Sequence, residues 1–269
     1  WHKKLDSLIE SASIEYDLFR YPIYDIRGRL RCTDNEWTAS EFVGHNDSGR
    51  IHCSGNWQIA PEGVPMHLDF RAENLPVDKE LKTALPAETQ FVWDEIRPQG
   101  TLDKVLVQLS RKTPHTAVRT EVRILEESST NASSGTSLRV KPKSFPYLLS
   151  DVDCDISYIP GYVKIHHASG TNGDSRIAMG GECMPREDGR WRADVKWLPQ
   201  TRLVVNRELL LALPASIRDS LVKTDFRGPI SIFGKSQIVF ADSEKNDLET
   251  AWDAQLAIED GQLADGSYI

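Results

Sequence analysis

Histidine and cysteine side chains are the residues of this sequence that could bind a metal. They occur as His52 beside Cys53 and as the pair His166 and His167. Structural zinc sites take four such ligands, with two of them roughly two to four residues apart. Adjacent residues of a strand point to opposite faces of a sheet, so the members of each pair diverge. The sequence therefore predicts histidines at the surface, with no metal site and no cofactor.

A phosphate-binding loop is the nucleotide-binding motif that the sequence approaches most closely. Residues 228–236, GPISIFGKS, have five residues between the two glycines, where the phosphate loop has four. No G-x-S-x-G nucleophile motif occurs in the chain. The neighbouring carboxylates Asp94 and Glu95 lie in a segment that recurs later, where Val222 and Lys223 take their places. The sequence therefore predicts a protein without enzymatic activity.

The chain contains four cysteines, at Cys32, Cys53, Cys154 and Cys183. Four cysteines are too few for a disulfide scaffold in a chain of this length. Cys32 and Cys53 lie on neighbouring predicted strands, and two alternatives stay open for them. They form either a disulfide bridge in an oxidising compartment or two buried thiols.

The composition is that of a soluble globular chain. Of its residues, 39% are hydrophobic and 27% are charged. The length of 269 residues is enough for one large domain or two ordinary ones. The formal net charge of −8 indicates that nucleic acid is not the partner. No apolar run approaches the roughly 18 residues of a membrane-spanning helix. The first residue is Trp1 rather than Met, which predicts that the chain is a segment of a longer protein or a processed product. The sequence leaves the oligomeric state open.

A repeated segment organises the elements that must position any site. Residues 77–100 recur as residues 205–228 at an offset of 128, and both contain the sequence ALPA. Upstream, the offset is 126, in the pairs Phe19/Phe145, Tyr21/Tyr147, Asp25/Asp151, Gly44/Gly170 and Gly55/Gly181. A fixed-period repeat of this length is typical of architectures that are built by stacking one unit.

Within each unit, apolar and polar residues alternate with a period of two, which is typical of half-buried strands. The repeated segment breaks this pattern and predicts helical caps at residues 77–97 and 205–224. Asp78 and Asn206 are the expected N-cap residues of these caps. Val92, Trp93 and Ile96 are expected to face inward. Pro86 and Pro214 fit the start of a second helix in each cap, although a hinge is the alternative.

The resulting fold class is α+β, predominantly antiparallel β, in which a strand-rich unit with a short helical cap occurs as a tandem repeat. Residues 1–18 are expected to be the tail of a preceding unit. Residues 19–144 form the first unit, residues 145–240 the second, and residues 241–269 the start of a further unit.

Three parts of this pattern resemble the AsmA-like proteins of the bacterial cell envelope, in particular the long planctomycete-type versions. They are FRYPIYDIRG at residues 19–28, with its copy FPYLLSDVDC at residues 145–154, and the ALPA-containing segment. The resemblance covers most of residues 13–240. Cys154 stands where the first copy has Gly28, which is a departure from the pattern.

The resemblance implies a non-enzymatic protein on the periplasmic side of the envelope, anchored to the inner membrane by a segment outside this chain. Such proteins are similar to bridge-like lipid-transfer proteins, in which a folded sheet forms an open, taco-like groove for lipid acyl chains. The residues expected to line this groove are the apolar members of the alternating pattern: Met66, Leu68, Phe70, Val105, Val107, Leu109, Val118, Val122, Ile124, Val195 and Trp197.

Two alternatives stay open. The alternating apolar residues could form a closed core in a structural or adhesive β-repeat module with protein or glycan partners. A stacking platform for sugars is the corresponding site, and it would use the tryptophans of the β-rich stretches: Trp37, Trp57, Trp191 and Trp197.

Overall fold

The computed structural model of the protein describes residues 4–16, 19–59, 64–113, 116, 118–126, 137–213, 215–224, 228–240 and 249–258. The first half contains β1 (Lys4–Ile9), β2 (Ile14–Tyr16), β3 (Phe19–Thr33), β4 (Glu36–Asn46), β5 (Gly49–Gln58), β6 (Met66–Pro76), α1 (Lys79–Ala84), α2 (Ala87–Ile96), β7 (Thr101–Arg111) and β8 (Arg119–Glu126). The second half contains β9 (Ser150–Ile159), β10 (Tyr162–Asn172), β11 (Ser175–Pro185), β12 (Trp191–Trp197), β13 (Arg202–Val204), α3 (Arg207–Ala212), α4 (Ala215–Thr224), β14 (Pro229–Phe240) and β15 (Glu249–Ile258).

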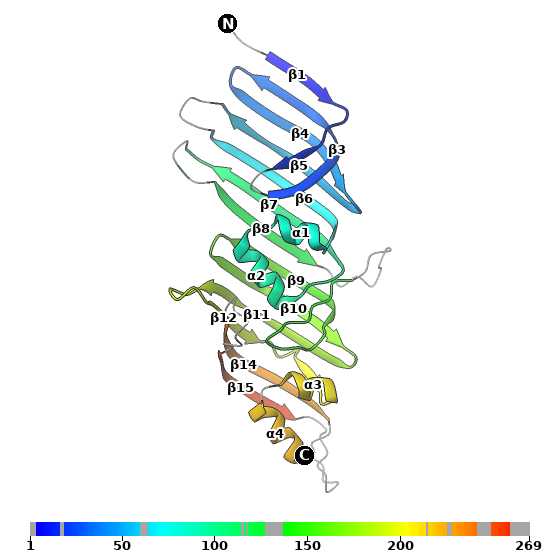
Figure 1. Cartoon of the computed structure of the whole chain (residues 1–269), viewed down its shortest axis with the longest axis vertical. Helices are drawn as coiled ribbons and strands as arrows, with labels where there is room; N and C mark the ends of the chain where they lie inside the picture. The colour runs from blue at the N-terminus through cyan, green and yellow to red at the C-terminus, as the bar shows by residue number, and fades with distance from the viewer. Residues whose placement is uncertain are drawn as a thin grey trace.

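All of these strands belong to one fifteen-stranded sheet, and neighbouring strands run antiparallel. They lie across the long axis of the molecule as successive rungs, with β1 at one end and β15 near the other (Figure 1). The sheet order follows the sequence from β3 to β12, and then β14 pairs with β12, β13 and β15. The predicted architecture, mostly antiparallel β-sheet with a few short helices, is therefore confirmed.

The helices form where the repeated segment predicts them, and their caps match. The Oδ1 atom of Asp78 accepts a hydrogen bond from the backbone N–H of Leu81 at 2.8 Å. Asn206 makes the same contact with Leu209, also at 2.8 Å. Pro86 directly precedes α2, which confirms the helix-start interpretation, whereas Pro214 lies outside the described residues. The same local sequence thus folds in the same way in both copies.

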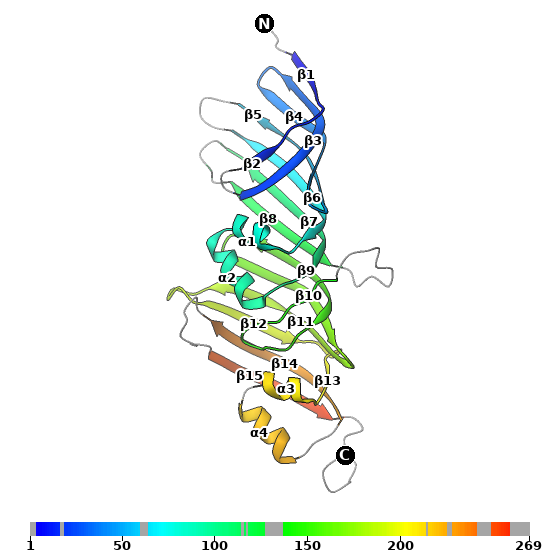
Figure 2. The same ribbon diagram turned by 45° about the vertical axis from the view of Figure 1, so that its right-hand side comes forward.

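The helices cover only part of one face of the sheet. Helices α1, α2 and α3 lie on the same side of it (Figure 2). Leu81 of α1 and Leu209 of α3 are buried in one cluster with sheet residues that include Ile51 and Val105. Residues 138–149 add Tyr147 to this cluster, which therefore lies beneath a cover of short helices and extended chain.

Helix α2 lies over strands from the other half of the chain. The ring of Phe91 stacks on Phe240 of β14, with 5.5 Å between the ring centroids. Trp93 packs against the main buried cluster, as expected. Ile96 was expected to face inward with it, and this prediction is wrong because Ile96 is 37% exposed. It is the last residue of α2, and the helix ends at the left-handed residue Arg97.

Candidate functional site: an apolar track along the sheet

Cross-strand pairing brings most of the predicted groove-lining residues onto one face. In the β6–β7 pair, Leu68 lies opposite Leu109 and Phe70 lies opposite Val107. In the β7–β8 pair, Val107 lies opposite Val122. Directly paired residues point to the same side of an antiparallel sheet, so these side chains share a face.

This face carries two adjacent rows of paired residues, which we call the apolar track. The first row has one residue per strand from β4 to β12 and then β14: Phe42, Cys53, Phe70, Val107, Val122, Tyr158, Val163, Cys183, Ala193 and Ile238. The second row runs from β5 to β15: Ile51, Ala72, Val105, Ile124, Ile156, Ile165, Gly181, Val195, Ser236 and Trp252. With neighbouring strands about 4.8 Å apart, a row of ten strands is about 43 Å long.

The two rows differ in how far they are covered. In the second row, Ile51, Val105 and Val195 are buried and belong to the cluster beneath the helices. In the first row, Phe70 and Val107 are half-buried. The first row is thus less covered at β6 and β7, whereas at its other end Cys183 is buried, and Val163, Ala193 and Ile238 pack in the same small cluster as Phe91 of α2.

The remaining predicted residues take three kinds of position. Met66 lies on the same face as the track, opposite Trp57 at the outer end of β6. Trp197 is buried and stacks on Trp252, with 5.7 Å between the ring centroids. Val118 was predicted to lie in a strand, but it immediately precedes β8 and is half-buried.

The strands β9 to β11 contribute residues that the sequence prediction did not name. Tyr158, Val163, Ile156 and Ile165 continue both rows across the middle of the molecule. Their alternation with polar neighbours is present in the sequence. The alternation is hard to recognise in β10 because the bulge at Ile165–Ala168 interrupts the period of two.

The opposite face of the sheet is polar and bears charged pairs. Arg123 of β8 forms a bidentate ion pair with Asp155 of β9, at 3.0 and 2.7 Å. Arg192 pairs with Asp194 at 2.9 Å. A shallow, open hollow of about 1000 Å³ is lined mainly by residues of this face, among them Arg71. The two faces therefore offer opposite chemistry, one apolar and one charged.

The adjacent His166 and His167 were predicted to point to opposite faces, and this prediction is wrong, because the bulge after Ile165 in β10 brings both against polar-face residues of β9. The Nε2 atom of His166 is 2.8 Å from the hydroxyl of Ser157. His167 instead lies 3.8 Å from the carboxylate of Asp153. The described residues thus bring neither histidine into a site with His52 and Cys53.

The two thiols of the first row are neutral. Burial, with a smaller contribution from Asp69, raises the pKa of Cys53 to about 11. Burial, with a smaller contribution from Asp194, raises the pKa of Cys183 to about 12. A thiol with so high a pKa is protonated at neutral pH, so both cysteines act as apolar lining.

The disulfide alternative for Cys32 is excluded. Cys32 lies opposite Trp37 on β4, whereas Cys53 lies opposite Phe42 on the same strand. Five residues along a strand separate the two points by about 17 Å. Both cysteines are free thiols.

The four tryptophans proposed as a sugar platform do not share one surface. Trp37 and Trp57 stack with their rings nearly parallel, at 6.1 Å and 6°, and both are half-buried. Trp191 and Trp197 are buried. An exposed aromatic surface of this kind is therefore limited to the Trp37–Trp57 pair.

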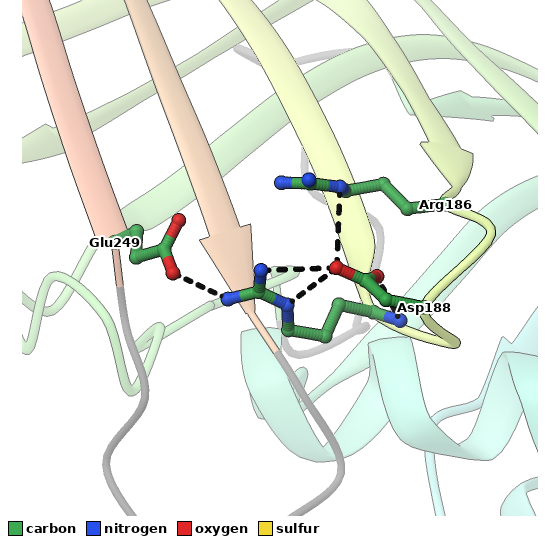
Figure 3. Close-up of polar contacts among 4 residues, drawn as sticks. Arg186, Asp188 and Glu249 are labelled. Atoms are coloured by element: carbon green, nitrogen blue, oxygen red, sulfur yellow. Dashed lines mark hydrogen bonds and ion pairs between the residues drawn. The ribbon is translucent and has the colours of Figure 1, made fainter.

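An ion-pair cluster joins the turn before β12 to the first residue of β15 (Figure 3). The guanidinium of Arg190 contacts Glu249 at 2.5 Å and Asp188 at 2.9 Å, and Arg186 lies 3.5 Å from Asp188. Hydrogen bonding from Arg190 lowers the pKa of Asp188. The cluster is largely exposed, so its contribution to stability is small.

Comparison of the chain with protein-family models, with curated proteins and with solved structures gives no match in any of the three. Of the helices in the described part of the chain, none has the length and apolar character needed to cross a bilayer.

Proposed function

We propose that this chain is a non-enzymatic segment of an AsmA-like protein of the bacterial cell envelope, and that its apolar track binds lipid acyl chains and guides them between membranes. The observation that carries the proposal is the pair of largely apolar rows across ten strands each, in which Phe70 and Val107 of the first row are only half-buried. In this proposal the chain lies on the periplasmic side, and parts of the protein outside this chain contact the inner membrane.

Its energetics and dimensions support this role. Each CH₂ group that an acyl chain buries against apolar side chains contributes about 0.8 kcal/mol. One leaflet of a bilayer core is about 15 Å thick, half of the full hydrocarbon thickness, so a row of about 43 Å accommodates two to three acyl chains end to end. The polar face of the same sheet keeps the protein in water while the lipid tails lie on the other side.

The proposed units, residues 19–144 and 145–240, join without a break in the track. At the β8–β9 boundary, Val122 lies opposite Tyr158 and Ile124 lies opposite Ile156. Stacking of further units would therefore extend one open, taco-like groove rather than create separate pockets.

A structural or adhesive β-repeat module with glycan or protein partners is the second candidate. The half-buried, stacked pair of Trp37 and Trp57 favours it, because a flat aromatic surface is suited to sugar rings. In that case the apolar face would serve as core, and the purified protein would bind glycans but carry no lipid.

The test is the lipid content of the purified protein, measured by mass spectrometry of an organic extract. We expect co-purified phospholipid with the wild-type chain. Val107→Lys places a charge in the first row, and we expect it to lower the lipid content about tenfold or more, since the charge must lie against the acyl chains.

Gln108→Lys is the matched control. Gln108 is the next residue of β7, and it lies on the polar face between Asp69 and Glu121, where a lysine is well accommodated. It should retain wild-type lipid content, and the unfolding temperatures of both variants show whether they are folded. A wild-type protein without lipid, or equal lipid in both variants, would contradict the proposal.

A further inference from the structure

A cluster of three carboxylates lies where the β4–β5 turn meets the first residues of α1. Asp47 of the turn, the N-cap residue Asp78 and Glu80 each place a carboxylate oxygen within 4.8 Å of the other two. No ion pair of these three carboxylates is found among the described residues, so three negative charges share a small volume.

A buried amide at the edge of this cluster points to a ligand. The side chain of Asn46 is 2% exposed, and its Nδ2 atom donates to the carboxylate of Glu80 at 3.1 Å and to the carbonyl of Pro22 at 2.8 Å. Both partners are acceptors, so the orientation of the amide is fixed. Its Oδ1 atom is buried and has no hydrogen-bond donor among the described residues. An oxygen without a donor, beside three carboxylates, is suited to a cation.

Comparison with the second copy of the unit shows which residues of this region are needed for its structure. Asn172 donates to the carbonyl of Leu148 at 2.9 Å and to Glu208 at 3.1 Å, which repeats the contacts of Asn46. In place of Asp47 and Asp78, however, this copy has Gly173 and Asn206.

The turn and the cap form equally well without the two aspartates. Asn206 caps α3 at 2.8 Å, the same distance as Asp78 in α1. Gly173 has a left-handed φ of 55° where Asp47 has 47°. The two extra carboxylates of the first copy are therefore not needed for folding, and their mutual repulsion requires another explanation.

The geometry and the donor set fit calcium. Calcium takes carboxylate and amide oxygens at about 2.3–2.6 Å, so two ligands on opposite sides of one ion lie about 5 Å apart. The observed limit of 4.8 Å is compatible with this span. The site has only oxygen donors, which disfavours zinc. Magnesium demands stricter octahedral geometry and releases its water reluctantly, so it suits an open surface cluster less well.

We propose that Asp47, Asp78 and Glu80, together with the Oδ1 atom of Asn46, bind one calcium ion that ties α1 to the β4–β5 turn. The second copy lacks this site. The neighbouring Tyr21 lies in the field of the same carboxylates, since burial and then Asp78, Glu80 and Asp47 raise its pKa. Bound calcium reduces that field and holds the helical cover on the sheet in the first unit only.

The experiment is a calcium titration of the EDTA-treated chain, followed by calorimetry and by thermal unfolding. We expect one site per chain, with a Kd of about 10⁻⁴–10⁻³ M, the range of extracellular calcium modules. At ten times the Kd, the unfolding temperature should rise by about 3 °C. Magnesium at the same concentration should give a clearly smaller shift.

Two double variants exchange the chemistry of the two copies. Asp47→Gly with Asp78→Asn gives the first copy the residues of the second, and it should lose calcium binding while keeping its unfolding temperature in EDTA. Gly173→Asp with Asn206→Asp should raise the stoichiometry from one to two, since a Cβ at Gly173 meets no atom within 4 Å. A wild type without calcium response, an equal response to magnesium, or undiminished binding in the first double variant would overturn the proposal.

Discussion

At the scale of single residues, the repeat places two buried tyrosines in equivalent positions. Tyr21 and Tyr147 each pack beside a phenylalanine two residues earlier, with 5.9 and 5.6 Å between ring centroids. The hydroxyl groups of both are buried without a hydrogen-bond partner among the described residues. A buried hydroxyl of this kind loses its hydrogen bonds to water and gains nothing in return.

Tyr147→Phe should therefore leave the free energy of unfolding unchanged or raise it by about 1 kcal/mol. The ring stays and only the unpaired hydroxyl is removed, and Tyr147 is fully buried. Urea unfolding measures the change. Leu209→Ala, in the same buried cluster, is the comparison and should lower the free energy of unfolding by about 2–5 kcal/mol. A loss above 1 kcal/mol for Tyr147→Phe would indicate that its hydroxyl has a partner.

At the scale of elements, two equivalent glycines allow neighbouring strands to approach closely. A Cβ added to Gly55 in β5 would lie 2.1 Å from the carbonyl oxygen of His67, and one added to Gly181 in β11 would lie 2.2 Å from that of Asp194. Next to each glycine, the adjoining strand has a shift in register, between Ala39 and Phe42 in β4 and correspondingly in β10. Glycine and bulge together bend the sheet at the same point in both copies.

Gly55→Ala and Gly181→Ala should each lower the free energy of unfolding by about 3 kcal/mol, because the new methyl group meets backbone that cannot move freely. Thermal or urea unfolding measures the loss. Gly173→Asn is the control: its backbone is left-handed, but asparagine tolerates that conformation and a Cβ there meets no neighbour. Equal free energies of unfolding for all three variants would contradict this prediction, because they would show that the neighbouring strands move apart without loss of stability.

The elements themselves could be predicted from sequence because their signals are local. Alternation in β6 and β7 placed Leu68 and Val107 on strands, and the residue type of Asp78 located a helix cap. The stacking of Phe91 on Phe240 could not be predicted, since it joins segments 149 positions apart with no local pattern. The same holds for the carboxylate cluster at α1, because its members come together only when the β4–β5 turn meets the helix.

At the scale of the whole molecule, the two predicted units meet at β8 and β9. The bidentate pair of Arg123 and Asp155 spans this boundary on the polar face. Hydrogen bonding from Arg123 lowers the pKa of Asp155. The folded state therefore holds this carboxylate ionised to a lower pH than the unfolded chain does.

The pH dependence of stability from this pair follows from the direction of the pKa shift of Asp155. A lowered folded pKa contributes stability that is present above the unfolded value of about 3.9 and is lost as the pH falls through the folded value. Asp155→Asn should lower the unfolding temperature slightly at pH 7, equivalent to less than about 1 kcal/mol for so exposed a pair. The difference from wild type should close toward pH 3, and it should shrink in high salt. A difference that persists at low pH would exclude the ion pair as its source.

The pairing of strands also determines how such a sheet grows. From β3 to β8, the first unit contributes six strands, and β9 then runs in the same direction as β3 because six is an even number. At about 4.8 Å per strand, each added unit lengthens the molecule by about 29 Å while the same face stays apolar. Each duplication of such a unit therefore lengthens the sheet by one step of this size and leaves the strand direction and the apolar face unchanged.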